Sequence, residues 1–130
     1  MHFKTISEIA ETVRNGSTTS RALTEQLIAR INRFDDTLNA YVTVTADAAL
    51  ESASAADAEL SKGSDRGPLH GSPIAIKDLC ATAGVRTTAG SKLYEHWVPD
   101  SDATVVRKLR DAGAVLLGKT GMHELAYGMD

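Results

Sequence analysis

The sequence is short of cysteine, positive charge and long hydrophobic runs. Cys80 is the single cysteine among 130 residues, which excludes a small secreted scaffold held by internal disulfides. Lys and Arg number 14 against 17 Asp and Glu, so the net charge of -3 leaves no positive field for nucleic-acid phosphates or anionic lipids. No stretch approaches the roughly 18 apolar residues of a membrane span, and Lys4, Ser7 and Glu8 interrupt any signal-peptide core. These absences predict a soluble cytoplasmic protein without a direct nucleic-acid or membrane partner.

What is present is the composition of an ordinary globular domain. Hydrophobic residues make up 42% of the chain, and the 10 glycines bring the apolar share to about half. A chain of this length fits one domain, since domains usually contain roughly 100 to 200 residues. We therefore expect one folded unit with a hydrophobic core.

The first 60 residues predict helices and one short strand. Thr5 and Glu8 form a capping box before a short amphipathic helix that Gly16 ends. The Ser/Thr cluster at 17–20 offers N-caps for a longer helix, whose apolar residues recur every three or four positions: Leu23, Leu27, Ile31 and Phe34. The next expected elements are a strand at 41–44, an alanine-rich helix at 46–60 and a loop at 61–71.

The pattern changes at a brief apolar run, 73–76, which stops abruptly at Lys77 and Asp78. This run predicts a buried strand that delivers polar groups at its carboxyl end. A lysine there can lose its charge through desolvation, and only the neutral amine acts as a base or nucleophile. Alternatively, Lys77 pairs with Asp78 or extends into solvent, and Asp78 fixes the turn by accepting backbone amide protons. The Gly-, Ala-, Thr- and Ser-rich segment 81–91 is typical of a loop near a site.

The remaining residues predict a helix and a second buried strand. Ser101 or Asp102 is expected to cap the helix, and a strand at 114–117 should lead into a polar turn at 118–121. The stretch from Gly113 to Thr120 also matches the P-loop pattern GxxxxGK[ST]. A P-loop needs a strand before its first glycine and a loop after it, whereas this sequence predicts the reverse. Lys119 is therefore expected to be a polar residue at a strand end, and the alternation of helices with strands predicts an α/β fold.

The sequence predicts neither a metal site nor a cofactor. Its four histidines are scattered and show no HExxH spacing: His2, His70, His96 and His123. Cys80 has no histidine beside it in the sequence to activate its thiol, so it is expected to be a small buried or loop thiol. A Schiff-base role for Lys77 is chemically open, but the sequence supplies no partner groups for it.

Two stretches, GSPIAIKDLCATAGVRTTAGSKLY and DATVVRKLRDAGAVLLGKTGMHELAYG, resemble the opening of the amidase signature family. The resemblance covers about residues 70–129, and the preceding helices are similar to the family's N-terminal helical layer. It implies an α/β fold in which helices flank a mixed β-sheet. Within one amidase domain, residues 1–62 would form the helical layer and residues 70–130 the first core strands with the lysine segment.

The same resemblance assigns the catalytic lysine to Lys77 and places Tyr127, Gly128 and Met129 beside the substrate pocket. In the family, this lysine acts through a serine in a cis peptide to remove a proton from a nucleophilic serine. The family's GGSSGGS segment, which supplies the nucleophile, is expected after Asp130. The resemblance therefore implies an N-terminal fragment that is inactive alone and that folds poorly, with exposed sheet faces and unpaired edges.

Three functions remain open at this point. The first is an amidase that releases ammonia or an amine from a small carboxamide through an acyl-enzyme. The second is the A subunit of glutamyl-tRNA amidotransferase, which uses the same chemistry on glutamine and passes ammonia to a partner protein of the same complex. His123 and Tyr127 resemble free-standing amidases more than that subunit. The third is a complete small protein that binds a ligand or partner without catalysis. A homodimer and amidotransferase partner subunits both remain open.

Overall fold

The computed structural model describes residues 4–128, and within them helices and strands alternate in an α/β arrangement. The elements in chain order are α1 (Ile6–Arg14), α2 (Ser20–Leu38), β1 (Tyr41–Val44), α3 (Ala46–Ser61), β2 (Pro73–Lys77), the 3-10 turn η1 (Lys92–Tyr94), α4 (Thr104–Asp111), β3 (Val115–Thr120) and the 3-10 turn η2 (Glu124–Ala126). The predicted order of helices and strands is confirmed.

Side chains close in sequence set the starts of the first two helices. At α1 both bonds of the predicted capping box are present: the Thr5 backbone N donates to Glu8 Oε2 at 2.7 Å, and Glu8 N donates to Thr5 Oγ1 at 3.3 Å. Thr19 caps α2 by accepting a hydrogen bond from Ala22 N at 3.0 Å. Because these partners are three residues apart, the sequence pattern was enough to find them.

The three strands form a mixed sheet in the order β1-β3-β2. β3 lies in the centre, antiparallel to β1 and parallel to β2. Thr120, the last residue of β3, is opposite both Tyr41 at the start of β1 and Lys77 at the end of β2. The mixed sheet expected from the amidase resemblance is confirmed.

β3 continues three residues further than predicted, so the expected polar turn from Gly118 is wrong. Gly118, Lys119 and Thr120 belong to the strand and pair with both neighbouring strands. Gly118 is needed there because a Cβ atom would collide with the Thr43 carbonyl oxygen of β1. The glycine that was interpreted as a turn signal instead permits a close approach between two strands.

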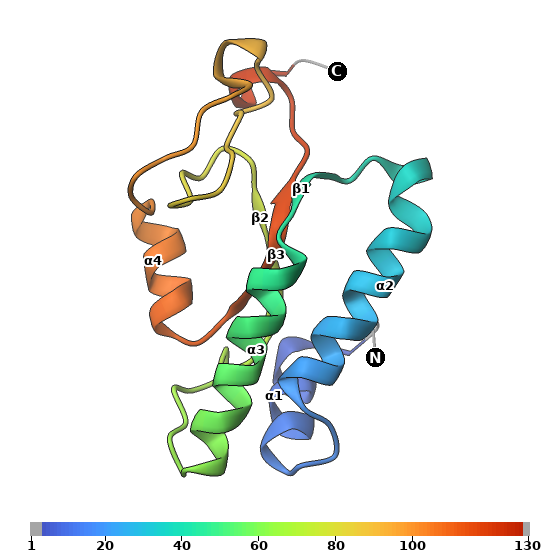
Figure 1. Ribbon diagram of the computed structural model, residues 1–130, viewed down its shortest axis with the longest axis vertical. Helices are drawn as coiled ribbons and strands as arrows, with labels where there is room; N and C mark the ends of the chain where they lie inside the picture. The colour runs from blue at the N-terminus through green and yellow to red at the C-terminus, as the bar shows by residue number, and fades with distance from the viewer. Residues whose placement is uncertain (1–3, 129–130) are drawn as a thin grey trace.

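Helices surround this sheet on several sides. In Figure 1, α4 lies to the left of the strands, α2 lies to the right, and α3 lies in front. The buried core joins two alanines of α3 to two residues of β3, and half-buried residues of α2 and β1 pack around it: Ala49, Ala53, Val115, Leu117, Leu27, Ile28, Ile31 and Tyr41. The small alanine side chains bring α3 close to the central strand.

The start of α4 differs from the prediction. Its N-cap is Ala103, which makes no side-chain cap bond, so the expected capping by Ser101 or Asp102 is wrong. Asp102 Oδ1 instead accepts a hydrogen bond from Ala83 N at 2.7 Å. Asp102 Oδ2 lies 3.4 Å from the Nε atom of Arg110. The carboxylate is therefore used to tie a distant loop to α4.

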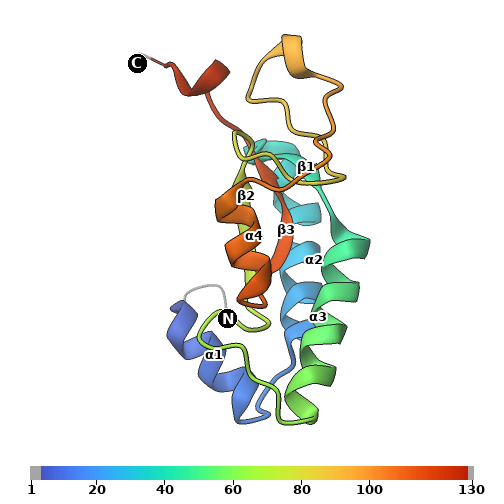
Figure 2. The same ribbon diagram turned by 90° about the vertical axis from the view of Figure 1, so that its left-hand side faces the viewer.

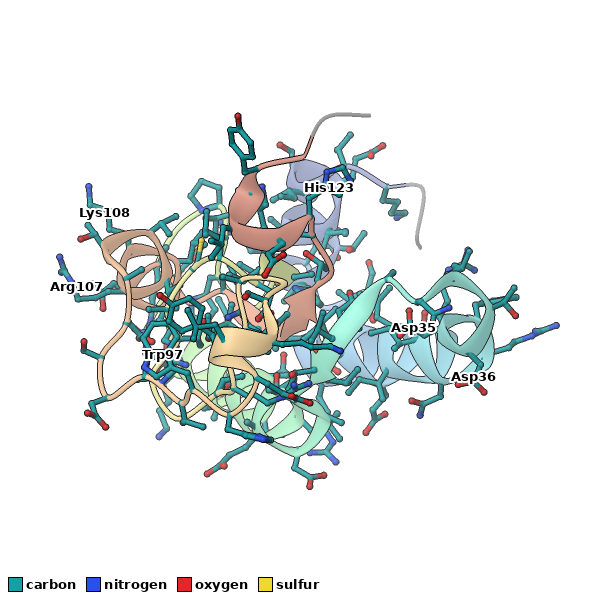
Figure 3. The ribbon with its side chains drawn as sticks, turned by 90° about the horizontal axis from the view of Figure 1, so that it is seen from above. Asp35, Asp36, Trp97, Arg107, Lys108 and His123 are labelled. Carbon is teal, nitrogen blue, oxygen red and sulfur yellow. The ribbon has the colours of Figure 1, made fainter. Side chains whose placement is uncertain are left out.

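Two segments without long helices or strands extend beyond the same end of the sheet. Figure 2 shows the loop between β2 and α4, drawn in yellow to orange, and the red segment after β3 projecting together from this end. In Figure 3, His123 lies on the red segment and Trp97 on the loop, whereas Arg107 and Lys108 point outward from α4. Within residues 4–128, none of the helices combines the length and the apolar character needed to cross a membrane.

Candidate active site

The carboxyl ends of the parallel strands β2 and β3 form one edge of a surface hollow. Ligands in open α/β sheets commonly bind beyond the carboxyl ends of parallel strands. Lys77 ends β2, and the chain that follows β3 supplies most of the opposite wall. This region, which we call the Lys77 hollow, is lined by Lys77, Thr120, Gly121, Met122, His123, Ala126 and Gly128.

Lys77 itself is exposed in the described part of the chain. β2 pairs with β3 alone among the described strands, and its burial alternates, with Ile76 buried between exposed Ala75 and Lys77. The expected burial of this strand is therefore wrong, because β2 is an edge strand with one covered face, although it does end at Lys77, directly before Asp78, as expected. The catalytic role of Lys77 remains a prediction, and the described residues do not themselves desolvate its amine.

Asp78, the next residue, is fully buried and does not pair with Lys77. Its Oδ1 atom lies 3.4 Å from Lys119 Nζ on β3, in an ion pair whose side chains are 0% and 2% exposed. Its Oδ2 atom accepts hydrogen bonds from Thr88 N at 2.9 Å and from the Thr88 hydroxyl. Asp78 thus accepts a backbone amide proton, but the donor lies ten residues away, so the expected role of its carboxylate in fixing the turn directly after Lys77 is wrong.

Lys119 is the buried lysine of this region. Its Nζ atom donates to the Cys80 carbonyl oxygen at 2.8 Å and to Thr87 Oγ1 at 2.7 Å. Burial lowers the pKa of Lys119 below its ordinary value, and the charge of Asp78 opposes this shift. Lys119 is a polar residue next to the end of β3, as expected, and the structure adds that its side chain is enclosed by the loop after β2.

The sequence contains an indirect signal for this ion pair. Lys77-Asp78 and Gly118-Lys119-Thr120 each place a charged residue beside a strand end. Only the parallel register, in which Lys77 is opposite Thr120, brings Asp78 and Lys119 within contact. The register was not predictable from the two segments separately.

The wall opposite Lys77 is held by the turn at 88–91. Ala89 O accepts a hydrogen bond from Leu125 N at 2.8 Å. Ser91 Oγ donates to Glu124 Oε1 at 2.6 Å. A Cβ atom on Gly90 would lie 2.8 Å from the Met122 carbonyl oxygen, so the two segments touch closely.

The structure brings only some of the predicted substrate residues into the Lys77 hollow. Gly128 lines it, whereas Tyr127 is 86% exposed and does not contribute to its lining. Met129 lies outside the described residues. A substrate role for these three residues is a prediction that the geometry leaves open.

The other features considered in the sequence are one buried histidine, possible metal ligands and the P-loop pattern. His70 is buried, its Nδ1 accepts from Arg66 N at 2.8 Å, and its Nε2 lies 3.0 Å from the Ala56 carbonyl oxygen. Residues 4–128 contain no group of three His, Cys, Asp or Glu side chains that could hold a metal ion. The strand at Val115–Thr120 occupies the place where a P-loop would have to curve around phosphate, as the sequence indicated.

Comparison with known sequences finds amidases and amidotransferase subunits. The family model described as Amidase matches residues 22–130. The A subunit of glutamyl-tRNA(Gln) amidotransferase from Halorhodospira halophila is 49% identical over 128 residues, which are 98% of this chain and 26% of that protein. The protein of the same name from Moorella thermoacetica is 44% identical over the same shares of the two chains.

Comparison with solved structures also finds amidases. The native peptide amidase of Stenotrophomonas maltophilia superposes with a TM-score of 0.88 at 39% identity, over 94% of this chain and 25% of that one. An amidase family protein of Bacillus anthracis gives 0.85 at 32% identity, over the same shares. The chain spans about a quarter of the length of the relatives it matches. It belongs to the amidase family, as its resemblance to amidase signature enzymes predicted.

Proposed function

We propose that the intact protein containing this chain is an amide hydrolase in which Lys77 is the general base. The observation that carries the proposal is the position of Lys77 at the carboxyl end of β2, on the edge of a hollow in an amidase-family fold. A cytoplasmic location is part of the same proposal, since a single cysteine fits a reducing compartment.

The proposed reaction needs a neutral amine at Lys77. This amine accepts a proton from a serine hydroxyl through a second serine, and the serine oxygen bonds to the carboxamide carbon. The C–N bond then breaks, and ammonia or an amine leaves with the proton returned by Lys77. Water hydrolyses the acyl-enzyme, which releases the acid and restores the serine.

Neither Ser91, which bonds to the wall of the hollow, nor Ser72, which precedes β2, fits the nucleophile role. Ser91 Oγ donates to Glu124 and accepts a hydrogen bond from Leu93 N at 3.2 Å. Ser72 is buried immediately before β2, at the end opposite Lys77. We propose that the two serines come from another part of the intact protein, and that Tyr127, Gly128 and Met129 contact the substrate.

The test is ammonia release by the intact protein from glutamine and from a panel of small carboxamides. Lys77→Ala should lower kcat by about 10²- to 10⁴-fold, the usual contribution of a positioned general base. Exposed Lys62→Ala is the matched control and should retain normal turnover. Lys62→Ala should also keep the thermal unfolding midpoint of the parent, because it changes an exposed side chain. Circular dichroism of Lys77→Ala, measured below its unfolding midpoint, checks that this variant is folded. Normal kcat in Lys77→Ala would remove this lysine from the mechanism.

A second candidate function is that of the A subunit in a glutamyl-tRNA(Gln) amidotransferase. It is favoured by the names of curated relatives that are 44–49% identical over 128 residues. This function requires partner subunits, whereas a free-standing amidase does not. Affinity purification of the intact protein from its own cells should therefore recover stoichiometric partners and glutamine-dependent amidation of glutamyl-tRNA(Gln). Full turnover of a small carboxamide by the purified single chain would favour the free-standing amidase instead.

A further inference from the structure

The buried ion pair beside the Lys77 hollow joins the central strand to the first part of the loop between β2 and α4. From β3, Lys119 reaches the Cys80 carbonyl at the start of this loop and the Thr87 hydroxyl seven residues later. Its third neighbour is Asp78, the residue that directly follows the proposed base. One amine thus connects three points that lie far from it in the sequence.

Asp78 fixes the backbone to which Lys77 is attached. Its backbone N donates to Thr120 O at 3.0 Å, and its carbonyl oxygen accepts from Ala89 N at 3.1 Å. Its carboxylate holds both the backbone N and the hydroxyl of Thr88. Lys77 therefore follows a paired strand and precedes a residue whose backbone and side chain are both anchored.

The same turn also supports the opposite wall of the hollow. Ala89, next to Thr88, accepts the hydrogen bond from Leu125 N, and Gly90 packs against the Met122 carbonyl. The contact between Ser91 and Glu124 adds a side-chain bond to this wall. A displacement of the turn at 88–91 would consequently move the segment that faces Lys77.

A buried ion pair is a costly way to hold a loop if stability is its only role. Well-packed apolar residues of similar volume often stabilise a protein equally well, because removing two charges from water is expensive. Here Asp78 Oδ2 and Lys119 Nζ are both hydrogen-bonded to the loop, whereas Asp78 Oδ1 has only the ion-pair contact at 3.4 Å. Buried polar groups bonded in this way favour one arrangement of the backbone around them.

We infer that Asp78, Thr88 and Lys119 form a positioning unit that sets the distance between the amine of Lys77 and the opposite wall of the hollow. The inference rests on the proposed function of Lys77. None of the three residues is placed against the substrate. They act through the backbone at Asp78 and through the turn at 88–91.

The test compares two substitutions of Thr88 in the intact protein. Thr88→Val keeps the shape and the backbone N–H but removes the hydroxyl that donates to Asp78 and accepts from Gly90 N. Thr88→Ser retains that hydroxyl. Thr88→Val should lower kcat by about 10- to 100-fold, as expected for a misplaced reacting group. The value of kcat/KM should fall in parallel, because an interaction used only in the transition state is lost. Thr88→Ser should restore most of kcat.

Leu23→Ala is the control for a purely structural effect. Leu23 is buried in α2, and its truncation destabilises the fold without touching the loop or the hollow. Measured well below its unfolding midpoint, Leu23→Ala should keep the parent kcat. If Thr88→Val behaves like Leu23→Ala, or if Thr88→Ser loses as much kcat as Thr88→Val, the positioning role is wrong.

A milder pair of variants at Glu124 serves if Thr88→Val does not fold. Glu124→Ala removes the acceptor of the Ser91 hydroxyl at the exposed end of the same network, and Glu124→Gln keeps an oxygen acceptor. Glu124→Ala should lower kcat, and Glu124→Gln should not; equal kcat in both would overturn the inference.

Lys77→Ala is measured in the same assay. If Lys77→Ala is inactive and the Thr88 and Glu124 variants are normal, only the positioning role fails, whereas normal turnover by Lys77→Ala removes the proposed function itself.

Discussion

At the scale of single residues, the two lysines of this region differ in their surroundings. Lys77 extends from an edge strand and is exposed in the described chain, whereas Lys119 extends from the central strand and is buried. The pKa of Lys119 falls because burial penalises its charged form, and Asp78 offsets part of that penalty. The charge of Lys119 is therefore stabilised by Asp78 and opposed by burial.

Removal of one member of the pair should be strongly destabilising. Lys119→Met leaves the Asp78 carboxylate buried without its cation, so the free energy of unfolding of the intact protein should fall by about 3–5 kcal/mol. The double variant Lys119→Met, Asp78→Asn removes both charges and should recover part of the loss. Urea unfolding of the parent, the single variant and the double variant measures both effects. A loss of stability equal in the single and double variants would contradict the charge-pair explanation.

The lowered pKa of Lys119 also predicts a pH dependence of stability. Between the native pKa and the ordinary value of 10.5, the unfolded chain binds more protons than the folded one, so stability from this group rises with pH. The free energy of unfolding of the parent relative to Lys119→Met should therefore increase as pH approaches 10.5. Urea titrations at several alkaline pH values give this difference. A difference that decreases with pH would have the wrong sign.

At the scale of secondary structure, β3 decides how the rest of the site is assembled. It pairs with β1 on one side and β2 on the other, and both pairings contain a register irregularity. Gly118 lies at the irregularity with β2, opposite Ala75, whereas the irregularity with β1 falls between Tyr41 and Thr43. On the β1 side Gly118 is opposite Val44. The close approach of β1 at Gly118 leaves no space for a side chain.

A methyl group at Gly118 should push β1 away from β3. Gly118→Ala is expected to cost about 1–3 kcal/mol or more of unfolding free energy, because the obstacle is a backbone carbonyl that has no rotamer to change. Gly121→Ala is the matched control, since its Cβ atom would lie 3.7 Å from the nearest backbone oxygens, an ordinary contact distance. Thermal unfolding of the two variants distinguishes them. Equal stability would show that β1 adjusts without cost.

At the scale of the whole molecule, the core of the described residues is thin. Half of the twelve buried hydrophobic residues are alanines, which contribute little apolar area each. Several large apolar side chains are exposed, among them Leu38 at 69% and Leu93 at 79%. Apolar burial is the main contribution that offsets the loss of chain entropy on folding. An isolated chain that buries small apolar side chains and exposes large ones therefore has a low free energy of unfolding.

The isolated 130-residue chain should therefore fold weakly. We expect a broad, weakly cooperative thermal transition and binding of the apolar dye ANS, and we expect neither property in the intact protein. Circular dichroism and dye fluorescence on both proteins at equal concentration provide the comparison. A sharp transition without dye binding in the isolated chain would show that the thin core is sufficient.

The sequence by itself determined the features that depend on neighbours within one or two helical turns. The capping box at Thr5, the helical periodicity of α2 and the alanine-rich α3 were all readable, because their partners lie close along the chain. The family resemblance added the mixed sheet and the candidate role of Lys77. Local patterns and motifs were enough for the elements and for the proposed chemistry.

Only the tertiary structure decided which distant polar groups meet. Asp102 was readable as a cap for α4, but the fold uses it to hold Ala83. Lys119 was readable as a strand-end residue, but the register of β2 on β3 buries it against Asp78. The physical reason is that a polar side chain satisfies its hydrogen bonds with whichever partner the packed chain brings within reach, and sequence distance does not limit that choice.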